Sequence, residues 1–374
     1  MWNGLLLVVS PSNYQFWAGT PDPRYGYGAM LQGFVDSVPK SVVFDERASV
    51  DVYMGVPYTK TGWRDGAWRV LFSMWETDVL PGRFYNWLKE FDQVLVPCEH
   101  NVELFGRYHP NVSKVPLGVH ETVWSPNHAE RSGPYRFHAG GSLWRRKGLD
   151  TVVTAFQKLA MPNTELHIKA APHASDTPNI KHPDIFMYRK WMSLSEQVEW
   201  FRQADCYIAA SRGEGWGLMP LQAIRAGIPT IMSDSTGHQE FLNLATQTIS
   251  CTKSKADTIG NWDEPNLEEL IEQMRWMVLN RGTAHQIAKE NSPRTDQYLW
   301  RNSTRKLLQA LPKGTLLDTT TFTRANPIVR VTALRPVHAY IINKTWHLTK
   351  GTEYGLPEPV YQVLSDSGAV KETK

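Results

Sequence analysis

The residues best suited to chemistry lie in one stretch, SRGEGWGLMPLQAIRAG, at positions 211–227. It holds one carboxylate, Glu214, between glycines, and one amide, Gln222, eight residues later. A helix is expected to begin around residues 216–218, with Pro220 in its first turn, where proline is tolerated. The free backbone N–H groups at such a helix end attract an anion. The alternative is an ordinary helix cap followed by a buried glutamine.

A second stretch, HAGGSLWRRKGLD at 138–150, has the same character. Its glycines let the backbone approach a ligand, and Arg145, Arg146 and Lys147 add positive charge. Alone, it would more often be a solvated basic turn before a helix. Two anion-attracting loops in one domain favour a diphosphate ligand over these structural alternatives.

The chain offers no obvious metal site, because it has no Asp-x-Asp pair and no His/Cys cluster with metal spacing. We therefore expect Lys, Arg and helix N-termini, rather than a chelated Mg²⁺, to neutralise a bound diphosphate. A GxxxxGK[ST] loop is also absent, which argues against ATP hydrolysis.

Alternating patterns predict the elements that position these residues. In the first part, β-like runs at residues 5–9, 41–44, 70–75, 93–97 and 112–117 alternate with helical patterns at 84–91 and 98–107. Such alternation is typical of a mainly parallel sheet flanked by helices.

A second alternating series follows a polar, turn-rich segment at 125–134. Strands are predicted at 135–141, 164–170, 206–210 and 228–233, and helices at 148–159, 194–204 and 294–311. Ser193 or Ser195 is expected to cap the helix at 194–204. In such sheets, ligands bind at the carboxyl ends of the strands, and both glycine-containing loops lie there.

The sequence thus predicts an α/β protein with two Rossmann-like domains facing a central cleft and a small C-terminal β-rich module. We assign residues 1–128 to an N-terminal acceptor domain, 129–312 to a C-terminal donor domain and 326–374 to the β-rich appendage. Short strands are expected within 328–349, and a small helix is expected to begin at Pro359.

Composition narrows the class of protein. The formal net charge of +3 over 374 residues is too small to imply nucleic-acid binding by itself. Three scattered cysteines, Cys98, Cys206 and Cys251, are typical of a reducing compartment. The apolar run near the N-terminus is too short to span a membrane. We expect a cytoplasmic protein without stable membrane insertion.

Several motifs resemble one enzyme family. RRKGLDTVVTAF and SRGEGWGLMPLQAIRAGIPTIMSDSTGHQEFL closely resemble the donor-binding domain of retaining GT-B-fold glycosyltransferases. Members usually carry Glu-x7-Glu, where this chain has Glu-x7-Gln. WETDVLP (75–81), VPLGVHETVWSP (115–126) and GYGAMLQGF (26–34) resemble the family's N-terminal domain, the last of them its glycine-rich first loop. The resemblance covers about residues 1–311.

The resemblance implies a nucleotide-sugar donor, UDP- or GDP-linked, with no further cofactor. Lys147 would contact the departing diphosphate, Glu214 the sugar hydroxyls, and Gln222 the ribose. Gly28 would let the first loop close over the diphosphate. The backbone of four further residues would hold phosphate and sugar: Gly215, Trp216, Gly217 and Leu218.

The chain departs from the family pattern at three places. Gln222 replaces the second glutamate. Ser142 stands where many members have a phosphate-binding arginine, so Arg145 or Arg146 is expected to compensate. WETD stands near the family's catalytic-loop histidine, so Glu76 or Asp78 is a candidate contact for the transferred sugar, with a structural hydrogen bond as the alternative for Glu76. The candidate catalytic residues are Lys147, Glu214, Glu76 and Arg146.

Three hypotheses about the acceptor and role remain open. The first is transfer of a sugar to a hydroxyl of a glycan or similar acceptor, with aromatic residues such as Trp63 and Trp68 exposed for binding. The second is a phage enzyme that glycosylates a hydroxymethylated DNA base such as 5-hydroxymethylcytosine, since the C-terminal module faintly resembles phage β modules; it would act in the host cytoplasm. The third is a degenerate transferase that serves as a sugar-binding or virion assembly protein.

Overall fold

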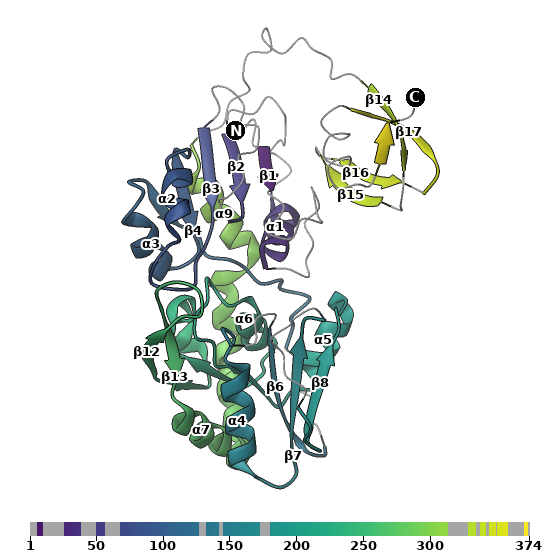
Figure 1. Cartoon of the computed structure of the whole chain (residues 1–374). Helices are drawn as coiled ribbons and strands as arrows, with labels where there is room; N and C mark the ends of the chain where they lie inside the picture. The colour runs from purple at the N-terminus through teal and green to yellow at the C-terminus, as the bar shows by residue number, and fades with distance from the viewer. Residues whose placement is uncertain are drawn as a thin grey trace.

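The computed structural model describes residues 6–9, 26–38, 50–56, 68–126, 132–141, 145–172, 180–312, 328–333, 337–341, 344–348, 350–357 and 370–372. Two parallel sheets, each flanked by helices, form an upper and a lower half in Figure 1. The predicted α/β class is confirmed.

The first sheet has its strands in chain order, all parallel. They are β1 (Leu6–Val9), β2 (Val50–Met54), β3 (Trp68–Phe72), β4 (Gln93–Val96) and β5 (Val112–Lys114). β4, with the sequence QVLV, is buried throughout, as expected for a strand covered on both faces. Sequence analysis missed β2, and the run at 41–44 lies outside the described residues.

Three helices accompany this sheet: α1 (Gly26–Ser37), α2 (Gly82–Leu88) and α3 (Glu99–Gly106). α2 and α3 match the helices predicted at 84–91 and 98–107. α1 differs from expectation, since the stretch GYGAMLQGF was predicted to be a glycine-rich loop and is helical here. Its residues Met30, Leu31 and Phe34 are buried in the core at helical spacing, which stabilises a helix despite the glycines.

The second sheet has a reversal in strand order. Its parallel strands lie in the order β11 (Gln247–Ile249), β10 (Thr230–Ser233), β9 (Cys206–Ala209), β6 (Tyr135–Gly141), β7 (Thr164–Ala170) and β8 (Ile185–Arg189). The direction of winding changes between β6 and β9, which are neighbours. The carboxyl ends of β6 and β9 therefore flank the switch point where α/β sheets bind ligands.

Helices cover both faces of this sheet. α4 (Leu149–Leu159) and α7 (Leu267–Leu279) share a core cluster with alternate residues of β6 and β7. α5 (Leu194–Arg202) and α6 (Leu218–Arg225) contribute to the cluster on the other face. Ser193 caps α5 in a capping box with Glu196, so Ser193 is the cap of the two candidates. Sequence analysis did not predict β8, or the hairpin of β12 (Cys251–Lys255) and β13 (Asn261–Pro265).

The predicted long helix at 294–311 is interrupted. A 3-10 helix, η3 (Ser292–Tyr298), precedes α9 (Trp300–Ala310), and α8 (Arg281–Asn291) precedes both. Leu299 has extended backbone because it forms a parallel bridge with Val119 of the first half. This pairing with a distant segment overrides the local helical pattern.

α9 returns to the first half of the molecule, although we grouped it with the second. The Trp300 ring packs edge-on against Phe34 of α1, with ring centroids 5.1 Å apart. Near the other end of α9, Gln93 Nε2 donates a hydrogen bond to the Ala310 carbonyl, at 2.9 Å. Figure 1 shows α9 beside α1 and the first sheet.

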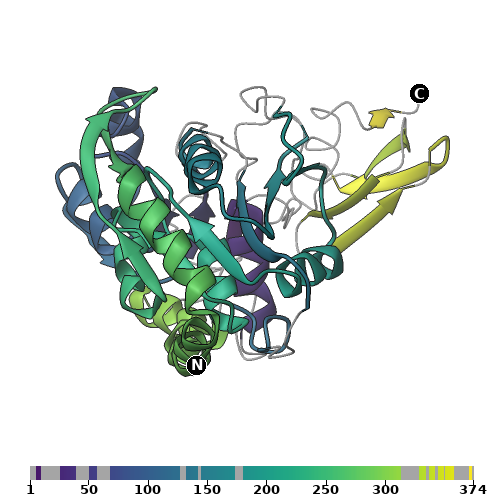
Figure 2. The same ribbon diagram turned by 90° about the horizontal axis from the view of Figure 1, so that it is seen from below.

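The described C-terminal residues form β structure. β14 (Ile328–Ala333) pairs with β17 (Glu353–Pro357) and β18 (Val370–Glu372), and β15 (Val337–Ile341) pairs with β16 (Lys344–Leu348). In both views these yellow strands lie to one side of the two halves (Figure 1 and Figure 2). The helix predicted from Pro359 lies outside the described residues. Across the described parts of the chain, none of the helices is both long and apolar enough to cross a membrane.

Candidate active site

The two predicted motifs meet at the switch point of the second sheet. The residues from Arg145 to Gly148 follow β6, and the loop from Ala210 to Gly217 follows β9. Gly148 has φ +64°, and a Cβ on it would lie 1.8 Å from the Ala210 carbonyl oxygen. Only glycine permits this close approach, which brings the two loops into backbone contact. Arg212 N donates to the Arg146 carbonyl, at 2.8 Å, and fixes the contact.

Glu214 is the centre of the site and is only 5% exposed. Its Oε1 accepts hydrogen bonds from Lys147 Nζ at 2.5 Å and from Ser211 Oγ at 2.7 Å. Its Oε2 lies 3.4 Å from Arg146 Nη1. The backbone of Glu214 is held as well, since its N–H donates to Thr236 Oγ1 at 2.8 Å. The structure thus brings together three of the four candidate catalytic residues.

The neighbouring charges and burial together determine the protonation states of Glu214 and Lys147. Burial alone would raise the pKa of Glu214, but the cations of Lys147 and Arg146 outweigh it and hold that pKa well below its ordinary value. Burial lowers the pKa of the Lys147 ammonium, and Glu214 partly offsets that effect. The site therefore carries two partly buried cations beside one buried, ionised carboxylate at neutral pH.

Glu76, the fourth candidate, approaches from the first half. Its Oε1 lies 3.7 Å from Arg146 Nη1, and Arg146 Nη1 also donates to the Gly213 carbonyl at 2.6 Å. The Glu76 carbonyl faces Gly213, where a Cβ would lie 2.2 Å from that oxygen. Arg146 therefore bridges carboxylates from the two halves of the chain.

The loop carrying Glu76 is fastened to the second half through Asp78. Asp78 accepts hydrogen bonds from the backbone N–H of Asn261 at 2.7 Å and from Asn261 Nδ2 at 2.9 Å. Asp78 N–H donates in return to the Asn261 carbonyl at 3.2 Å. We call these contacts the Asp78–Asn261 clasp. Because both Asp78 oxygens are engaged, the structure gives Asp78 a structural role rather than a place facing Glu214.

The start of α6 lies beside Glu214, as predicted. α6 begins at Leu218, and Gly217 caps it with φ +106°. Trp216 is buried against Phe241 and Tyr298, so its backbone, and not its ring, borders the loop. Gly215 O accepts a hydrogen bond from Cys98 Sγ at 3.2 Å, which ties the loop to α3.

Gln222 and Gly28 both lie within helices. Gln222 is in the second turn of α6, and its Oε1 accepts a hydrogen bond from Gln197 Nε2 of α5 at 3.3 Å. Gly28 lies in the first turn of α1, so it is not a loop residue. Its neighbour Tyr27 hydrogen-bonds Met74 through its hydroxyl, and Met74 packs against Gly215. α1 thus reaches the site indirectly.

Arg145 and Arg146, the two arginines expected to compensate for Ser142, lie in different surroundings. Arg146 contacts Glu214, but Arg145 is 55% exposed on its side chain and pairs with Asp257 at 2.9 Å. The Arg145 guanidinium also lies 5.8 Å from the centre of the Trp262 ring. It is therefore directed to the β12–β13 hairpin and its connecting turn. Ser142 lies outside the described residues.

Sequence reasoning missed Arg212, although it lies inside the opening motif. Its buried guanidinium donates to both oxygens of Asp150, at 2.7 and 2.9 Å, and to both oxygens of Glu264, at 2.6 Å each. These contacts join α4, the motif loop and the hairpin. The partners are 52 and 62 residues away, so no local pattern could have identified them.

His238 is a second missed residue. It is fully buried in η1 (Thr236–Glu240), and its Nδ1 lies 3.2 Å from the Ser233 carbonyl. Its Cδ2 would lie 2.8 Å from a Cβ at Gly217, so the imidazole supports the cap of α6. Burial lowers the pKa of His238, and a neutral ring is expected there.

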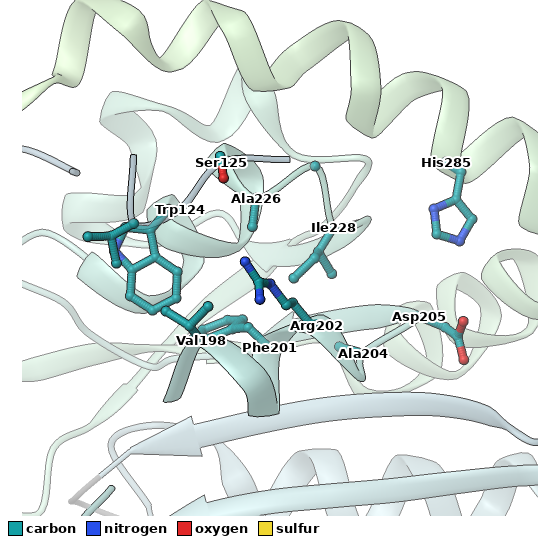
Figure 3. A pocket seen from close by; sticks show the side chains of 12 residues that line it. Trp124, Ser125, Val198, Phe201, Arg202, Ala204, Asp205, Ala226, Ile228 and His285 are labelled. Carbon is teal, nitrogen blue, oxygen red and sulfur yellow. The ribbon is translucent and has the colours of Figure 1, made fainter. Parts of the chain in front are cut away.

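A separate small pocket lies at the opposite end of the second sheet (Figure 3). It is lined by residues that precede β9 and β10, including Asp205 and Ile228, together with Trp124 and His285. The amino ends of these strands face away from the loops that carry Lys147 and Glu214. This pocket therefore does not belong to the candidate active site. Within the described residues, no group of three or more His, Cys, Asp or Glu side chains could hold a metal ion.

Known structures share this fold at low sequence identity. A glycosyltransferase from Rickettsia africae ESF-5 superposes with a TM-score of 0.56 at 12% identity, over 82% of this chain and 97% of that chain. WaaG, a glycosyltransferase involved in lipopolysaccharide biosynthesis, gives 0.55 at 13%, over 81% and 98%. The pneumococcal O-GlcNAc transferase GtfA, solved with UDP and GlcNAc, gives 0.51 at 15%, over 75% of this chain and 58% of that longer chain. These neighbours establish a GT-B fold.

Sequence comparison identifies the family. Curated proteins gave no significant match. Residues 102–307, more than half of the chain, match the family described as Family 4 Glycosyltransferase in conflict systems. The matched range contains Lys147, Glu214 and all of the second sheet. The chain belongs to this family and is a glycosyltransferase.

Proposed function

We propose that the protein is a retaining, metal-independent glycosyltransferase that moves a sugar from a UDP- or GDP-sugar to an acceptor hydroxyl. The observation that carries the proposal is the buried cluster of Lys147, Arg146 and Glu214 at the switch point. Two cations beside the start of α6 match the charge of a leaving diphosphate. GtfA, which shares the fold, was solved with UDP and GlcNAc, which makes UDP the first nucleotide to test.

The chemistry assigns each residue a task. As the bond between the sugar C1 and the diphosphate oxygen breaks, negative charge grows on the diphosphate and positive charge on the sugar. Lys147 and Arg146 stabilise the first, and Glu214 hydrogen-bonds the sugar hydroxyls and stabilises the second. The acceptor oxygen bonds to C1 on the same face, and its proton passes to the leaving diphosphate oxygen. No separate base is required.

Glu76 is proposed to contact the transferred sugar from the first half. It already lies 3.7 Å from Arg146, so a donor bound there would lie between the Glu76 loop and the Glu214 loop. Gln222 is proposed to bind the donor ribose, where an amide oxygen accepts hydroxyl hydrogen bonds as a carboxylate would. The roles expected for Gly28, Arg145 and Ser142 in binding the donor have no such support and remain predictions.

Nucleotide release tests this proposal directly. Purified protein is incubated with UDP- and GDP-sugars with and without EDTA, and with glycan and hydroxymethylated DNA acceptors; nucleotide release and product mass are measured. We expect release that is unchanged by EDTA and depends on Lys147. The anomeric configuration of the product, read by NMR, decides retention. Product on DNA alone would identify a modified base as the acceptor, and inversion or full loss with EDTA would contradict the mechanism.

A further inference from the structure

Lys169 is a partly buried lysine that has no acidic partner among the described residues. It is the sixth residue of β7, and burial lowers the pKa of its ammonium. Three other lysines of the second half, Lys147, Lys158 and Lys253, each pair with a carboxylate. Burying an unpaired cation costs stability, so a compensating function is expected.

The strand places Lys169 at the carboxyl end of the second sheet. Leu166 and Ile168 belong to the cluster with α4 and α7, and since side chains alternate along a strand, Lys169 lies on the face of α5 and α6. Lys169 pairs in register with Gly140 of β6. A Cβ on Gly140 would lie 3.3 Å from Lys169 Cβ and 3.1 Å from Met219 Cε. Lys169 therefore stands next to the first turn of α6.

Gly140 and Gly141 separate the two lysines of this region. A Cβ on Gly141 would meet Lys147 Cγ at 2.3 Å, whereas one on Gly140 would meet Lys169. Met219, beside Gly140, is three residues before Gln222 and so lies on the same side of α6. Lys169 and Gln222 thus lie on the face of the sheet that α6 covers, beyond the glycines from Lys147.

The charges explain why Lys169 and Gln222 would occur together. A glutamate at position 222 would place a carboxylate on the same side of α6 as Met219, the side beside Gly140 and Lys169. With the amide, the ammonium has no counter-charge among the described residues, and its three N–H donors are available to oxygen acceptors of a ligand. In the proposed complex, Lys147 and Arg146 bind the diphosphate of the nucleotide-sugar. The nucleoside is the next group along the donor.

We propose that Lys169, together with Gln222, binds the nucleoside of the donor, with its ammonium donating to nucleoside oxygen atoms. This inference rests on the proposed function. Uracil and guanine carry carbonyl oxygens, and the ribose carries hydroxyls, so both are suitable acceptors for the ammonium. Lys169 is then a residue for nucleotide selection, separate from the residues that contact the reacting bond.

Calorimetric titration of the full chain tests the assignment. UDP, 2′-deoxy-UDP, GDP and inorganic pyrophosphate are titrated into the wild type, Lys169→Met, Lys147→Met and a control, Lys158→Met, whose lysine is exposed on α4. Lys169→Met should weaken UDP or GDP about tenfold, as for the loss of one charged hydrogen bond, and leave pyrophosphate unchanged. Lys147→Met should weaken both. If 2′-deoxy-UDP already binds weakly and does not respond to Lys169→Met, the contact is to the ribose; if it responds like UDP, the contact is to the base.

Thermal unfolding shows whether Lys169→Met changes the stability of the fold, as distinct from its binding of nucleotide. Lys169→Met removes a partly buried charge that has no carboxylate partner among the described residues, so its Tm should equal or exceed that of the wild type. Unchanged nucleotide binding, or an equal loss of nucleotide and pyrophosphate binding, would overturn the assignment and leave the proposed function intact. Failure of the wild type to bind any of the nucleotides would refute both.

Discussion

Lys147 Nζ and Glu214 Oε1 lie 2.5 Å apart, and the two side chains are 18% and 7% exposed. The two residues are 67 positions apart, and two loops joined through Gly148 bring them together. Each charge satisfies the other in this contact. In the proposed mechanism, a bound diphosphate gives Lys147 a second acceptor, while Ser211 continues to donate to Glu214.

Replacing Lys147 with alanine should lower turnover by roughly 10²–10³, the effect of losing one preorganised electrostatic donor. The charge on the leaving diphosphate would then depend on Arg146 and the start of α6. Initial rates at saturating donor measure the effect. Lys158→Ala, on the surface of α4, is the matched control and should keep wild-type turnover. Near-normal turnover of the Lys147 variant would remove Lys147 from the mechanism.

Replacing Glu214 with glutamine should abolish transfer and lower stability at pH 7 by about 3 kcal/mol, since it leaves two partly buried cations without their carboxylate. The pKa of Glu214 is lower in the folded than in the unfolded state. Its stabilisation is therefore complete above the unfolded pKa of about 4.5 and is lost as the pH falls below it.

Thermal scans from pH 7 to pH 3 test whether the stabilisation by Glu214 is lost as the pH falls. The Tm of the wild type should fall more steeply below pH 4.5 than that of Glu214→Gln, so the two curves converge in acid. Parallel curves would show that the Glu214 carboxylate contributes no stability of its own.

Replacing Arg212 with methionine should destabilise the fold without a direct effect on the reacting atoms. Asp150 and Glu264 would lose their shared cation, but each side chain is about one-third exposed, so water partly compensates. A loss of about 2–3 kcal/mol is expected, below the range for fully buried pairs. Urea unfolding measures it. Arg145→Met, at a more exposed position, should change stability by less than about 1 kcal/mol.

Opening the Asp78–Asn261 clasp should affect catalysis more than stability. Asp78→Ala removes both side-chain contacts to Asn261 and frees the loop that holds Glu76 opposite Arg146. Misplacement of such a group by about 1 Å lowers kcat/KM by up to about 10²-fold. Asn261→Ala removes only one of the two contacts and should give an intermediate loss. Wild-type rates in both variants would show that the Asp78–Asn261 clasp does not position Glu76.

Replacing Gln222 with glutamate should alter donor affinity and spare turnover. A charged acceptor forms hydrogen bonds that are stronger by about 1 kcal/mol, which corresponds to about a fivefold change in Kd. Because Gln222 is proposed to contact the ribose and not the reacting bond, kcat should stay within about twofold, the signature of uniform binding. A large gain in kcat would place position 222 in the chemistry.

Local patterns sufficed for much of the second half. The alternation in YRFHAGG and TELHIKA and the helical spacing in GLDTVVTAFQKL predicted β6, β7 and α4 within a few residues. The glycine-bounded Glu214 and the basic run at 145–147 indicated the site, because both follow strands of a parallel sheet. Their actual contact depends on β6 and β9 being neighbours, which the pattern alone does not determine.

The structure differs from the sequence-based prediction where contacts between segments far apart in the chain determine the local conformation. Leu299 breaks a helical pattern because it pairs with Val119, and GYGAMLQGF is helical because Phe34 packs on Trp300 and Phe72. Arg145 turns to Trp262 in a hairpin that has no strong signal of its own. Of the two tryptophans expected to be exposed, Trp68 is 42% exposed, and Trp63 lies outside the described residues.

The return of α9 to the first half has a consequence for synthesis on the ribosome. Trp300 fills the space above Gly33 and Gly118, where a Cβ would lie 2.1 and 2.6 Å from atoms of the indole. More than 180 residues separate Gly118 from Trp300, so at roughly 5–20 residues per second the nascent first half waits about ten seconds or more for its last helix. During that interval the surface of α1 around Phe34 is uncovered. Vectorial translation therefore completes the second half before the first, the reverse of their order in the chain.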